Sequence, residues 1–548
     1  MSDFKNKVVY QIYPKSFYDS NNDGHGDLKG ITEKLDYLAY LGVDYLWLNP
    51  IFISPQKDSG YDITDYRNID PKFGTMEDLE ELIAEAEKRN IYLMFDMVFN
   101  HTSTTHEWFQ KALQGEEKYQ NYYIFKKPVE GRMPNHWESK FGGPVWEYIK
   151  EMDAYYLHLF DKTQADLNWQ NPQVRKEMTD IVNFWIKKGV RGFRFDVINL
   201  IDKVSFEEDD QGIGKRMYTD GPLVHQYIRE MNQQSFGKYE NMLTVGEMSA
   251  TSLKNCIAYT NPKKHELNMT FNFHHLKVDY KNKEKWTVMA FDFKELKQLF
   301  HTWQTGMQRG GGWNALFWNC HDQPRSLSRF GDDKRYPKES AKMLATAIHL
   351  QRGTPYIYQG EEIGMTNAYF TEIDQYRDVE SINFYYILKE QGKTEEEIHE
   401  ILQAKSRDNA RTPMQWDSTG GFSKTKPWID MNTNYPTVNV ENCLKDPDSI
   451  FHYYCQLIQL RKTYPVISEG DYLPLFEEHP QVYAFKRTYH NESLIVLNNF
   501  YGEAATLHID RIQAYEVLIS NYKNHELQDE LILRPYESIA LYKKSEKA

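Results

Sequence analysis

Short apolar runs recur along the chain, and segments with helical spacing separate them. The segments repeat apolar residues every three or four positions, as amphipathic helices do, at Ile31–Gly42, Thr75–Asn90, Pro172–Gly189 and Lys338–Gly353. Several runs are apolar at consecutive positions, which is typical of strands buried on both faces. The runs are Val8–Tyr13, Tyr45–Leu48, Tyr92–Met97, Gly192–Asp196, Leu243–Glu247, Met269–Phe273, Ala315–Trp318 and Tyr356–Tyr358. Eight alternating strands and helices predict an α/β fold, the (β/α)8 or TIM barrel.

Two long segments interrupt this alternation. Residues 102–170 follow the third strand and are rich in Tyr, Trp and Gly, and residues 366–428 follow the eighth. After the predicted last helix, Ser449–Tyr464, the chain changes to short alternating strands. We therefore predict a barrel domain of residues 1–101 and 171–466, an inserted domain of residues 102–170, and a C-terminal antiparallel β domain of residues 467–548.

Composition narrows the class of protein. The formal net charge of −14 argues against a nucleic-acid partner and against binding to an anionic membrane surface. The four cysteines form no CxxC pair, which favours neither a disulfide framework nor a zinc site. The sequence shows no signal peptide and no apolar stretch of membrane-spanning length. We expect a cytoplasmic protein with reduced thiols.

Three carboxylates fall at the ends of different predicted strands. Asp196 ends the fourth strand, Glu247 ends the fifth, and Asp322 lies just beyond the seventh. Catalytic groups of such barrels sit at the carboxyl ends of the strands, so these acids should share one mouth. A single acid there could be a helix cap or an ion-pair partner, but three, with Arg194 beside them, suit glycoside hydrolysis. We expect Arg194 to lower the pKa of Asp196 and keep it ionised.

At this point four segments resemble the signature regions of the α-amylase superfamily, glycoside hydrolase family 13. They are DMVFNH (Asp96–His101), GFRFDVIN (Gly192–Asn199), VGEM (Val245–Met248) and CHDQPR (Cys320–Arg325). The segment QADLNW (Gln164–Trp169) resembles the fifth region of the oligo-1,6-glucosidase branch. The resemblance extends over essentially the whole chain. One departure is the order Asn319-Cys320, which is commonly reversed in relatives, and we expect it to alter packing beneath the site.

The resemblance implies a retaining mechanism. Asp196 would be the nucleophile, Glu247 the general acid and then base, and Asp322 the residue that stabilises the distorted sugar. An inward-facing Asp62 would close the pocket and make the enzyme release a single glucose. No organic cofactor is implied. The substrate-binding residues implied for the −1 subsite are Tyr61, Asp62, His101, Gln164, Arg194, His321 and Arg411.

The segment DSNNDGHGD, Asp19–Asp27, has the alternating oxygen donors of a cation-binding loop. The ligands would be the side chains of Asp19, Asn21, Asp23 and Asp27 and the carbonyl of His25. A similar loop holds Ca²⁺ in this branch of the family, and the ion would be structural. Gly30 stands where a full EF-hand loop has its bidentate Glu. Mg²⁺ and an Asx-rich turn without metal remain alternatives.

The segment FNFHHLKVDYKNKEKW, Phe271–Trp286, is basic within an acidic chain. It follows the sixth strand, so its loop should rise on the catalytic face. We expect His275, Lys277 and Lys285 to bind a substrate phosphate. The residues of this segment resemble those of the trehalose-6-phosphate hydrolases. The resemblance implies hydrolysis of a phosphorylated disaccharide, α,α-trehalose 6-phosphate, to glucose and glucose 6-phosphate.

Two other functions stay open at this stage. One is an oligo-1,6-glucosidase acting on neutral isomalto-oligosaccharides, which would share the acids but not the use of the basic segment. The other is a catalytically inactive accessory subunit, which typically has a membrane anchor and lacks part of the triad. Asp196, Glu247 and Asp322 are all present here. The sequence does not indicate an oligomeric state.

Overall fold

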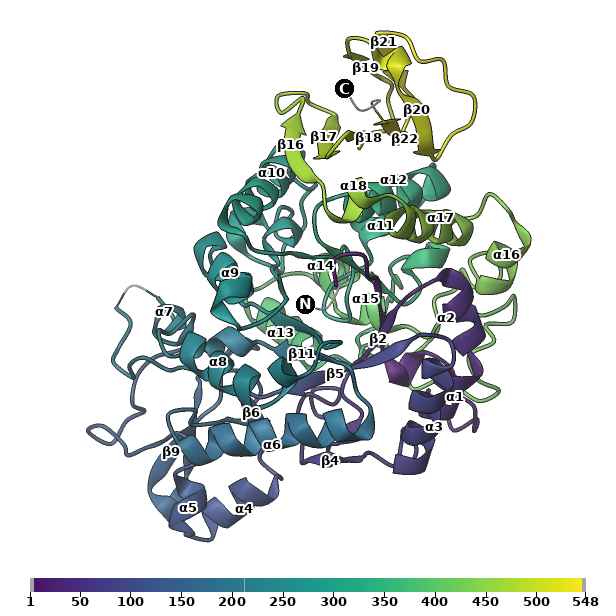
Figure 1. The fold of residues 1–548 in the computed structure, drawn as a ribbon. Coiled ribbons are helices and arrows are strands. Elements are labelled where there is room, and N and C mark those ends of the chain that lie inside the picture. The colour runs from purple at the N-terminus through teal and green to yellow at the C-terminus, as the bar shows by residue number, and fades with distance from the viewer. Residues whose placement is uncertain (1–3, 211, 545–548) are drawn as a thin grey trace.

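Eight parallel strands form the centre of the molecule (Figure 1), in a computed structural model that describes residues 4–210 and 212–544. They lie in the order β13-β12-β11-β5-β2-β1-β15-β14. A parallel bridge between Thr270 and Asn314 joins the two outer strands. The ring is therefore closed, as the (β/α)8 prediction requires. The strands are β1 (Val9–Ile12), β2 (Tyr45–Leu48), β5 (Tyr92–Val98), β11 (Gly192–Asp196), β12 (Leu243–Glu247), β13 (Met269–Phe271), β14 (Ala315–Leu316) and β15 (Thr354–Tyr358).

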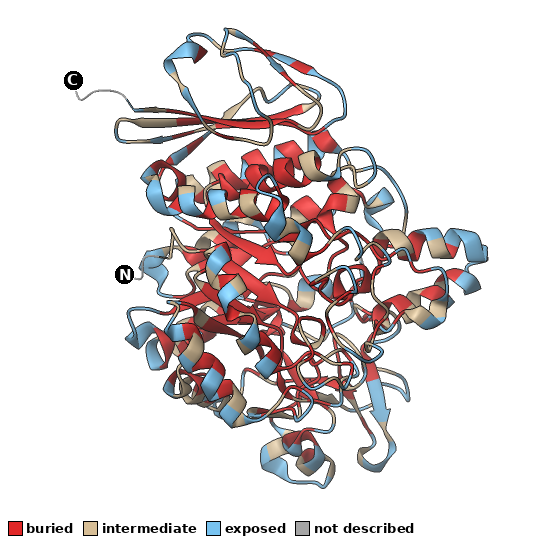
Figure 2. Cartoon of the chain, turned by 90° about the vertical axis from the view of Figure 1, so that its right-hand side faces the viewer, coloured by how far each residue is buried: buried red, intermediate tan, exposed pale blue. Residues whose placement is uncertain are grey.

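Helices cover the outside of this ring, and Figure 2 shows the strands between them as almost entirely buried. The predicted helix over 31–42 is two helices, because the chain leaves helical geometry at Lys34. Asp27 caps the first of them and Gly42 ends the second in the left-handed conformation. The main helices are α1 (Leu28–Glu33), α2 (Leu35–Leu41), α3 (Met76–Glu87), α6 (Pro172–Lys188), α8 (Val224–Gln234), α9 (Leu253–Thr260), α10 (Phe293–Gly310), α12 (Pro337–His349) and α17 (Ile450–Thr463).

The segment after β5 forms the inserted domain. β6 (His101–Ser103) pairs with β10 (Gln164–Asp166), so the two ends of the insert lie side by side on the catalytic face. Between them lie α4 (Glu107–Leu113), α5 (Glu117–Gln120) and a small antiparallel sheet of β7 (Phe125–Lys126), β9 (Ala154–Leu157) and β8 (Trp146–Ile149).

The segment after β15 contains α13 (Val379–Glu390), α14 (Glu395–Lys405) and α15 (Asp408–Arg411). The last of these and the residue just before it, Arg407, bring two arginines, Arg407 and Arg411, to the mouth of the barrel. This return contributes directly to the site described below.

The C-terminal region is antiparallel, as predicted, and lies at the top of Figure 1. Its five-stranded sheet has the order β16-β17-β18-β22-β20, and β19 pairs with β21. The bounds are β16 (Asp471–Leu475), β17 (Val482–Tyr489), β18 (Glu492–Asn499), β19 (Ala505–His508), β20 (Glu516–Ser520), β21 (Glu530–Leu533) and β22 (Ser538–Lys544). The exact domain boundaries remain predictions. Within the described part of the chain, no helix is both long and apolar enough to cross a bilayer.

Candidate active site

The three predicted catalytic acids line one pocket of about 240 Å³. Asp196 and Glu247 end the neighbouring strands β11 and β12, and Asp322 lies in the loop after β14. All three side chains face the same cavity because parallel strands present their carboxyl ends at one edge. The first and the last of these acids, Asp196 and Asp322, are 126 positions apart in the chain, and the fold brings them to one pocket.

Arg194 connects the carboxylates beneath this pocket. Its Nη1 lies 2.6 Å from Asp96 Oδ1 and 2.6 Å from Asp196 Oδ1, and its Nη2 donates to Glu247 Oε2. The guanidinium is almost fully buried. One planar group therefore holds the predicted nucleophile and the predicted acid at close spacing.

The net effect on Asp196 differs from the expectation. Burial raises the pKa of Asp196 well above its ordinary value; Arg194 opposes this, and the charges of Glu247 and Asp96 add to it. Burial also raises the pKa of Asp96 to about 6. Burial therefore outweighs Arg194, and the pKa of Asp196 is raised rather than lowered.

Asp322 has the opposite environment. Burial would raise its pKa, but His321, Arg407 and Arg411 outweigh burial and hold the pKa of Asp322 well below its usual range. Arg407 Nη1 and Arg411 Nη2 lie 3.1 and 3.0 Å from Oδ1, and His321 Nε2 lies 3.2 Å from Oδ2. The carboxylate is therefore ionised and fixed in position.

A flat aromatic face borders the acids, as predicted for Tyr61. The Tyr61 ring stacks on His321 with centroids 5.2 Å apart and planes at 5°. Its hydroxyl donates to Asp96 Oδ2 at 2.8 Å. Trp47 Nε1 donates to the same oxygen at 3.1 Å. This network holds the ring against the pocket, where it can stack on a sugar.

The expectation for Asp62 needs correction. Its side chain is fully buried, and its carboxylate accepts hydrogen bonds from Ser54 Oγ and from the backbone N–H groups of Lys57 and Asp58. Asp58 lines the pocket instead, 3.3 Å from Arg407 Nη2. Burial raises the pKa of Asp58 to about 7, although Arg407 and Arg411 oppose the shift. The spacing of two acids on one loop did not reveal which faces inward.

His101 and Gln164 occupy different depths. His101 lines the pocket, and burial lowers its pKa to about 4, so the ring is neutral near pH 7. Gln164 is outside the lining; its Nε2 lies 3.1 Å from Asp58 Oδ2 and 3.2 Å from His101 Nε2. Gln164 therefore supports two residues that line the cavity, and its direct contact with a sugar stays a prediction.

Two of the three predicted phosphate-binding residues face the pocket. Lys277 and Lys285 line it, but Lys285 Nζ is paired with Glu380 Oε2 at 2.6 Å. His275 lies elsewhere: its Nε2 is 2.9 Å from the carbonyl oxygen of Phe317, and its ring contacts the rings of Phe300 and Phe317. Burial lowers the pKa of His275 to about 4. Its assignment as a phosphate ligand is therefore corrected to a core position.

The loop that carries these lysines is anchored by a buried acid. Asp279 accepts from Arg329 Nε at 2.9 Å and lies 2.8 Å from Lys405 Nζ. Arg329 belongs to α11 (Ser326–Phe330), and Lys405 ends α14. Because two cations hold one carboxylate, Lys277 extends from a fixed backbone.

Several lining residues were absent from the sequence prediction. The inserted domain supplies Lys140, Phe141 and Phe160, and the segment after β15 supplies Arg407 and Glu380. Lys140 Nζ donates to Ser249 Oγ at 2.9 Å. Four of these residues lie outside regular helices and strands, and Glu380 lies in the first turn of α13; no sequence period marks any of them as facing the mouth, so only the fold places them there.

The predicted cation loop is closed by its own hydrogen bonds. Asp19 Oδ1 accepts from Asn22 N at 2.7 Å, its Oδ2 accepts from Gly24 N at 2.8 Å, and Asp27 Oδ1 accepts from Gly30 N at 2.7 Å. The all-oxygen donor set suits a hard cation. Yet no cluster of three acidic, His or Cys side chains that could hold a metal occurs among the residues described. The metal-free turn therefore remains an alternative.

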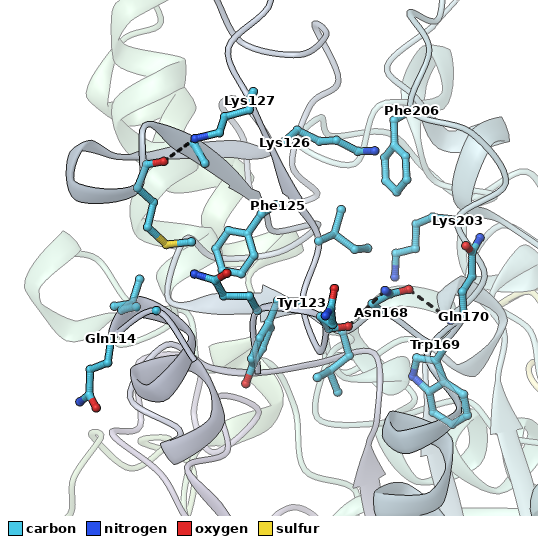
Figure 3. Close-up of a pocket in the computed structure, with 18 of the residues that line it drawn as sticks. Gln114, Tyr123, Phe125, Lys126, Lys127, Asn168, Trp169, Gln170, Lys203 and Phe206 are labelled. Carbon is cyan, nitrogen blue, oxygen red and sulfur yellow. Dashed lines mark hydrogen bonds between the residues drawn. The ribbon is translucent and has the colours of Figure 1, made fainter. Parts of the chain in front are cut away.

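A second cavity, of about 650 Å³, lies between the inserted domain and the barrel (Figure 3). Lys203 on its lining is committed to Asp166 at 2.7 Å and to Asn100 Oδ1 at 2.7 Å. Its lining has a single carboxylate, Glu151, and no facing partner acid. It therefore lacks the paired carboxylates that glycoside hydrolysis requires.

The family follows from comparison with known proteins. Residues 11–470 match the family model described as alpha amylase, catalytic domain, and residues 482–540 match the alpha-amylase SusG C-terminal domain. The chain belongs to the α-amylase family of glycoside hydrolases. The first match contains the three catalytic acids and also Arg407 and Arg411 of the segment after β15.

Relatives of two named activities resemble the whole chain. A trehalose-6-phosphate hydrolase of Bacillus subtilis is 55% identical over 547 residues, covering 98% of this chain and 97% of that protein. An oligo-1,6-glucosidase of Parageobacillus thermoglucosidasius is 48% identical, with 98% of each chain covered. The crystal structure of Bacillus licheniformis trehalose-6-phosphate hydrolase superposes with a TM-score of 0.96 at 53% identity, with 100% of each chain covered.

Proposed function

We propose that this protein hydrolyses α,α-trehalose 6-phosphate to glucose and glucose 6-phosphate. The unphosphorylated ring would occupy the −1 subsite between Tyr61, Asp58 and the three acids. The phosphorylated ring would occupy the +1 subsite toward the basic loop. The names of the most similar relatives support the reaction, and the charges of the pocket support the substrate.

The observation that carries the proposal is the position of Lys277. This lysine lines the pocket of the catalytic acids and is exposed to it. It forms no ion pair within the described residues, unlike Lys285, whose charge Glu380 balances. An ammonium without a carboxylate partner beside the catalytic acids favours a substrate that brings its own negative charge.

The chemistry proposed is a double displacement. Asp196 attacks the anomeric carbon of the −1 glucose while Glu247 gives its proton to the bridging oxygen, so that glucose 6-phosphate leaves. Glu247 then takes a proton from water, and the water oxygen replaces Asp196 on the sugar. A single guanidinium spans Asp196 and Glu247, which supports the short carboxyl spacing of retaining enzymes rather than the wider spacing that admits a water.

The alternative substrate is a neutral isomalto-oligosaccharide. Identity alone does not separate the two, because the trehalose-6-phosphate hydrolase of Escherichia coli and the oligo-1,6-glucosidase of P. thermoglucosidasius are both 48% identical to this chain. The accessory-subunit alternative is disfavoured, since the three acids line one pocket and Arg194 contacts Asp196 beneath it.

The deciding experiment compares kcat/KM for trehalose 6-phosphate with kcat/KM for isomaltose. The proposal requires the phosphorylated substrate to be preferred, and preference for isomaltose would overturn it. Lys277→Ala should raise KM for trehalose 6-phosphate by an amount equivalent to about 1.5–3 kcal/mol, the worth of a charged hydrogen bond. The matched control is Lys281→Ala, which removes the same charge from the same loop at a residue outside the pocket lining.

Two further properties belong to the proposal. We infer a cytoplasmic location, supported by four cysteines that are all unpaired and by a phosphorylated substrate. We also infer that Ca²⁺ stabilises the loop Asp19–Asp27, supported by its alternating oxygen donors. In that case Asp19, Asn21, Asp23, Asp27 and the carbonyl of His25 would hold the ion, away from the acids.

A further inference from the structure

We propose that Lys140 of the inserted domain is a specificity-determining residue, which closes with Lys277 on the substrate phosphate from the opposite side of the +1 subsite. This inference rests on the proposed function and extends it, because it gives the inserted domain a part in recognising the phosphate. The sequence pattern did not single out Lys140.

The position of Lys140 places it on the leaving-group side. Its ammonium lies 2.9 Å from Ser249 Oγ, two residues beyond the predicted acid Glu247. The acid must approach the bridging oxygen, so the chain just beyond it borders the leaving ring. Lys277 lines the same cavity from the loop after β13. The two lysines therefore reach the +1 subsite from the inserted domain and from the barrel.

The backbone that carries Lys140 is fixed. Its N–H donates to the carbonyl of Leu159 at 2.9 Å. The neighbouring Ser139 Oγ donates to the carbonyl of Phe160 at 2.7 Å. The next residue, Phe141, has its ring 5.6 Å from that of Phe160 and 5.1 Å from the guanidinium of Arg407. A preorganised side chain loses less entropy on binding its ligand, so it discriminates more strongly.

In the free protein the ammonium of Lys140 faces two neutral groups, the hydroxyl of Ser249 and the ring of Tyr218, whose centroid lies 5.6 Å away. No ion pair joins it to a carboxylate within the described residues, and its neighbour Ser249 is neutral. Lys203, which lines the cavity between the inserted domain and the barrel, is by contrast paired with a carboxylate: its Nζ lies 2.7 Å from Asp166 Oδ2. A phosphate dianion would supply the partner that Lys140 lacks.

The surroundings of Lys140 make its charge responsive to pH. Burial, together with the charges of Lys215 and Lys277 and against the opposite effect of Glu247 and Asp166, lowers the pKa of Lys140 to about 7. A bound phosphate would raise this pKa, because it favours the ammonium form. Phosphate binding should then take up a proton near neutral pH, and KM for the phosphorylated substrate should rise as the pH is increased above about 7.

Substitutions of Lys140 can distinguish a role in phosphate recognition from a role in hydrolysis itself. Lys140→Met should raise KM for trehalose 6-phosphate roughly 10-fold or more, and this rise should exceed its effect on KM for p-nitrophenyl α-glucoside, which has no phosphate, by about 5-fold or more. Lys140→Arg, which stays charged at all working pH values, should bind the phosphate without the rise of KM above pH 7. The control is Lys150→Met, which removes a charge from an exposed position of the same domain outside the pocket.

The outcomes are distinct. If Lys140→Met leaves KM for trehalose 6-phosphate unchanged while Lys277→Ala raises it, the inference about Lys140 is wrong and the proposed function stands. If the parent protein prefers isomaltose, the function itself is wrong. Lys140→Met could lose turnover of both substrates together with a fall in melting temperature. In that case the inference is tested by KM for trehalose 6-phosphate in Lys140→Gln and by the pH dependence of this KM in Lys140→Arg. A profile for Lys140→Arg identical to that of the parent would overturn the inference.

Discussion

Asp58 and Arg407 are separated by 349 positions in the chain, yet their side chains form an ion pair of 3.3 Å in the lining of the catalytic pocket. Both residues are almost fully buried, whereas Lys277 on the same lining is exposed. Under the proposed function, Asp58 and Arg407 would border the −1 subsite and bind the far hydroxyls of a glucose.

The first prediction concerns this pair. Asp58→Asn should lower kcat/KM by roughly 10- to 100-fold for phosphorylated and neutral α-glucosides alike, because the lost hydrogen bonds involve the ring common to both. Steady-state kinetics on trehalose 6-phosphate and p-nitrophenyl α-glucoside measure this. Asp62→Asn is the matched comparison: it should mainly lower the melting temperature, since Asp62 accepts only protein hydrogen bonds. A selective loss on the phosphorylated substrate in Asp58→Asn would contradict the assignment.

The second prediction separates the two predicted catalytic roles. Glu247→Gln should slow trehalose 6-phosphate far more than p-nitrophenyl α-glucoside in the first step, because a nitrophenolate leaves without being protonated. Asp196→Asn should abolish turnover of both, by about 10⁴-fold or more, since no carboxylate remains to attack. Burst kinetics and product release provide the readout. Equal losses on both substrates in Glu247→Gln would argue against its role as acid.

The third prediction concerns the anchor of the basic loop. Asp279→Ala leaves Arg329 and Lys405 buried without their shared partner, so the melting temperature should fall. The loop should also loosen, and KM for trehalose 6-phosphate should rise while KM for a neutral glucoside changes little. Thermal unfolding and kinetics on both substrates test the two effects. A loss of stability with no selective change in KM would show that the anchor does not position Lys277.

The fourth prediction concerns the loop Asp19–Asp27. If it binds Ca²⁺, removing the ion with a chelator should lower the melting temperature, and adding Ca²⁺ should restore it by mass action. Asp23→Ala removes a donor with an exposed side chain and should abolish the response to Ca²⁺. Lys29→Ala, just beyond the loop, is the control. A melting temperature indifferent to chelator and to Ca²⁺ would favour the metal-free turn.

The barrel and its acids could be predicted because strands impose a period and strand ends converge. Asp196 and Glu247 end their strands as expected, and Asp322 follows the seventh. Residues on irregular loops were harder, because a loop sequence does not tell which side chain turns inward. Asp62 was predicted to face the pocket, but Asp58, for which no role was predicted, lines it instead. Both His275 and Lys277 were predicted to face the pocket, and only Lys277 does, while His275 lies in the core.

The pocket residues supplied by the inserted domain and by the segment after β15 could not be predicted from their own local sequence. Lys140 approaches Ser249 across 109 positions, and Arg407 approaches Asp322 across 85. No property of either neighbourhood in the sequence encodes these meetings. These contacts depend on how the inserted domain and the segment after β15 pack against the mouth of the barrel.

Under the proposed function, the burial of Asp58 and Arg407 determines the order in which the two products leave. A glucose held against Asp58 and Arg407 has its exit blocked by whatever ring occupies the outer position. The phosphorylated fragment must diffuse away first, and only then can water reach the glycosyl-enzyme and free the glucose. Any alcohol that enters by the same opening at that moment competes with water, so concentrated sugars should divert the intermediate into new glucosides.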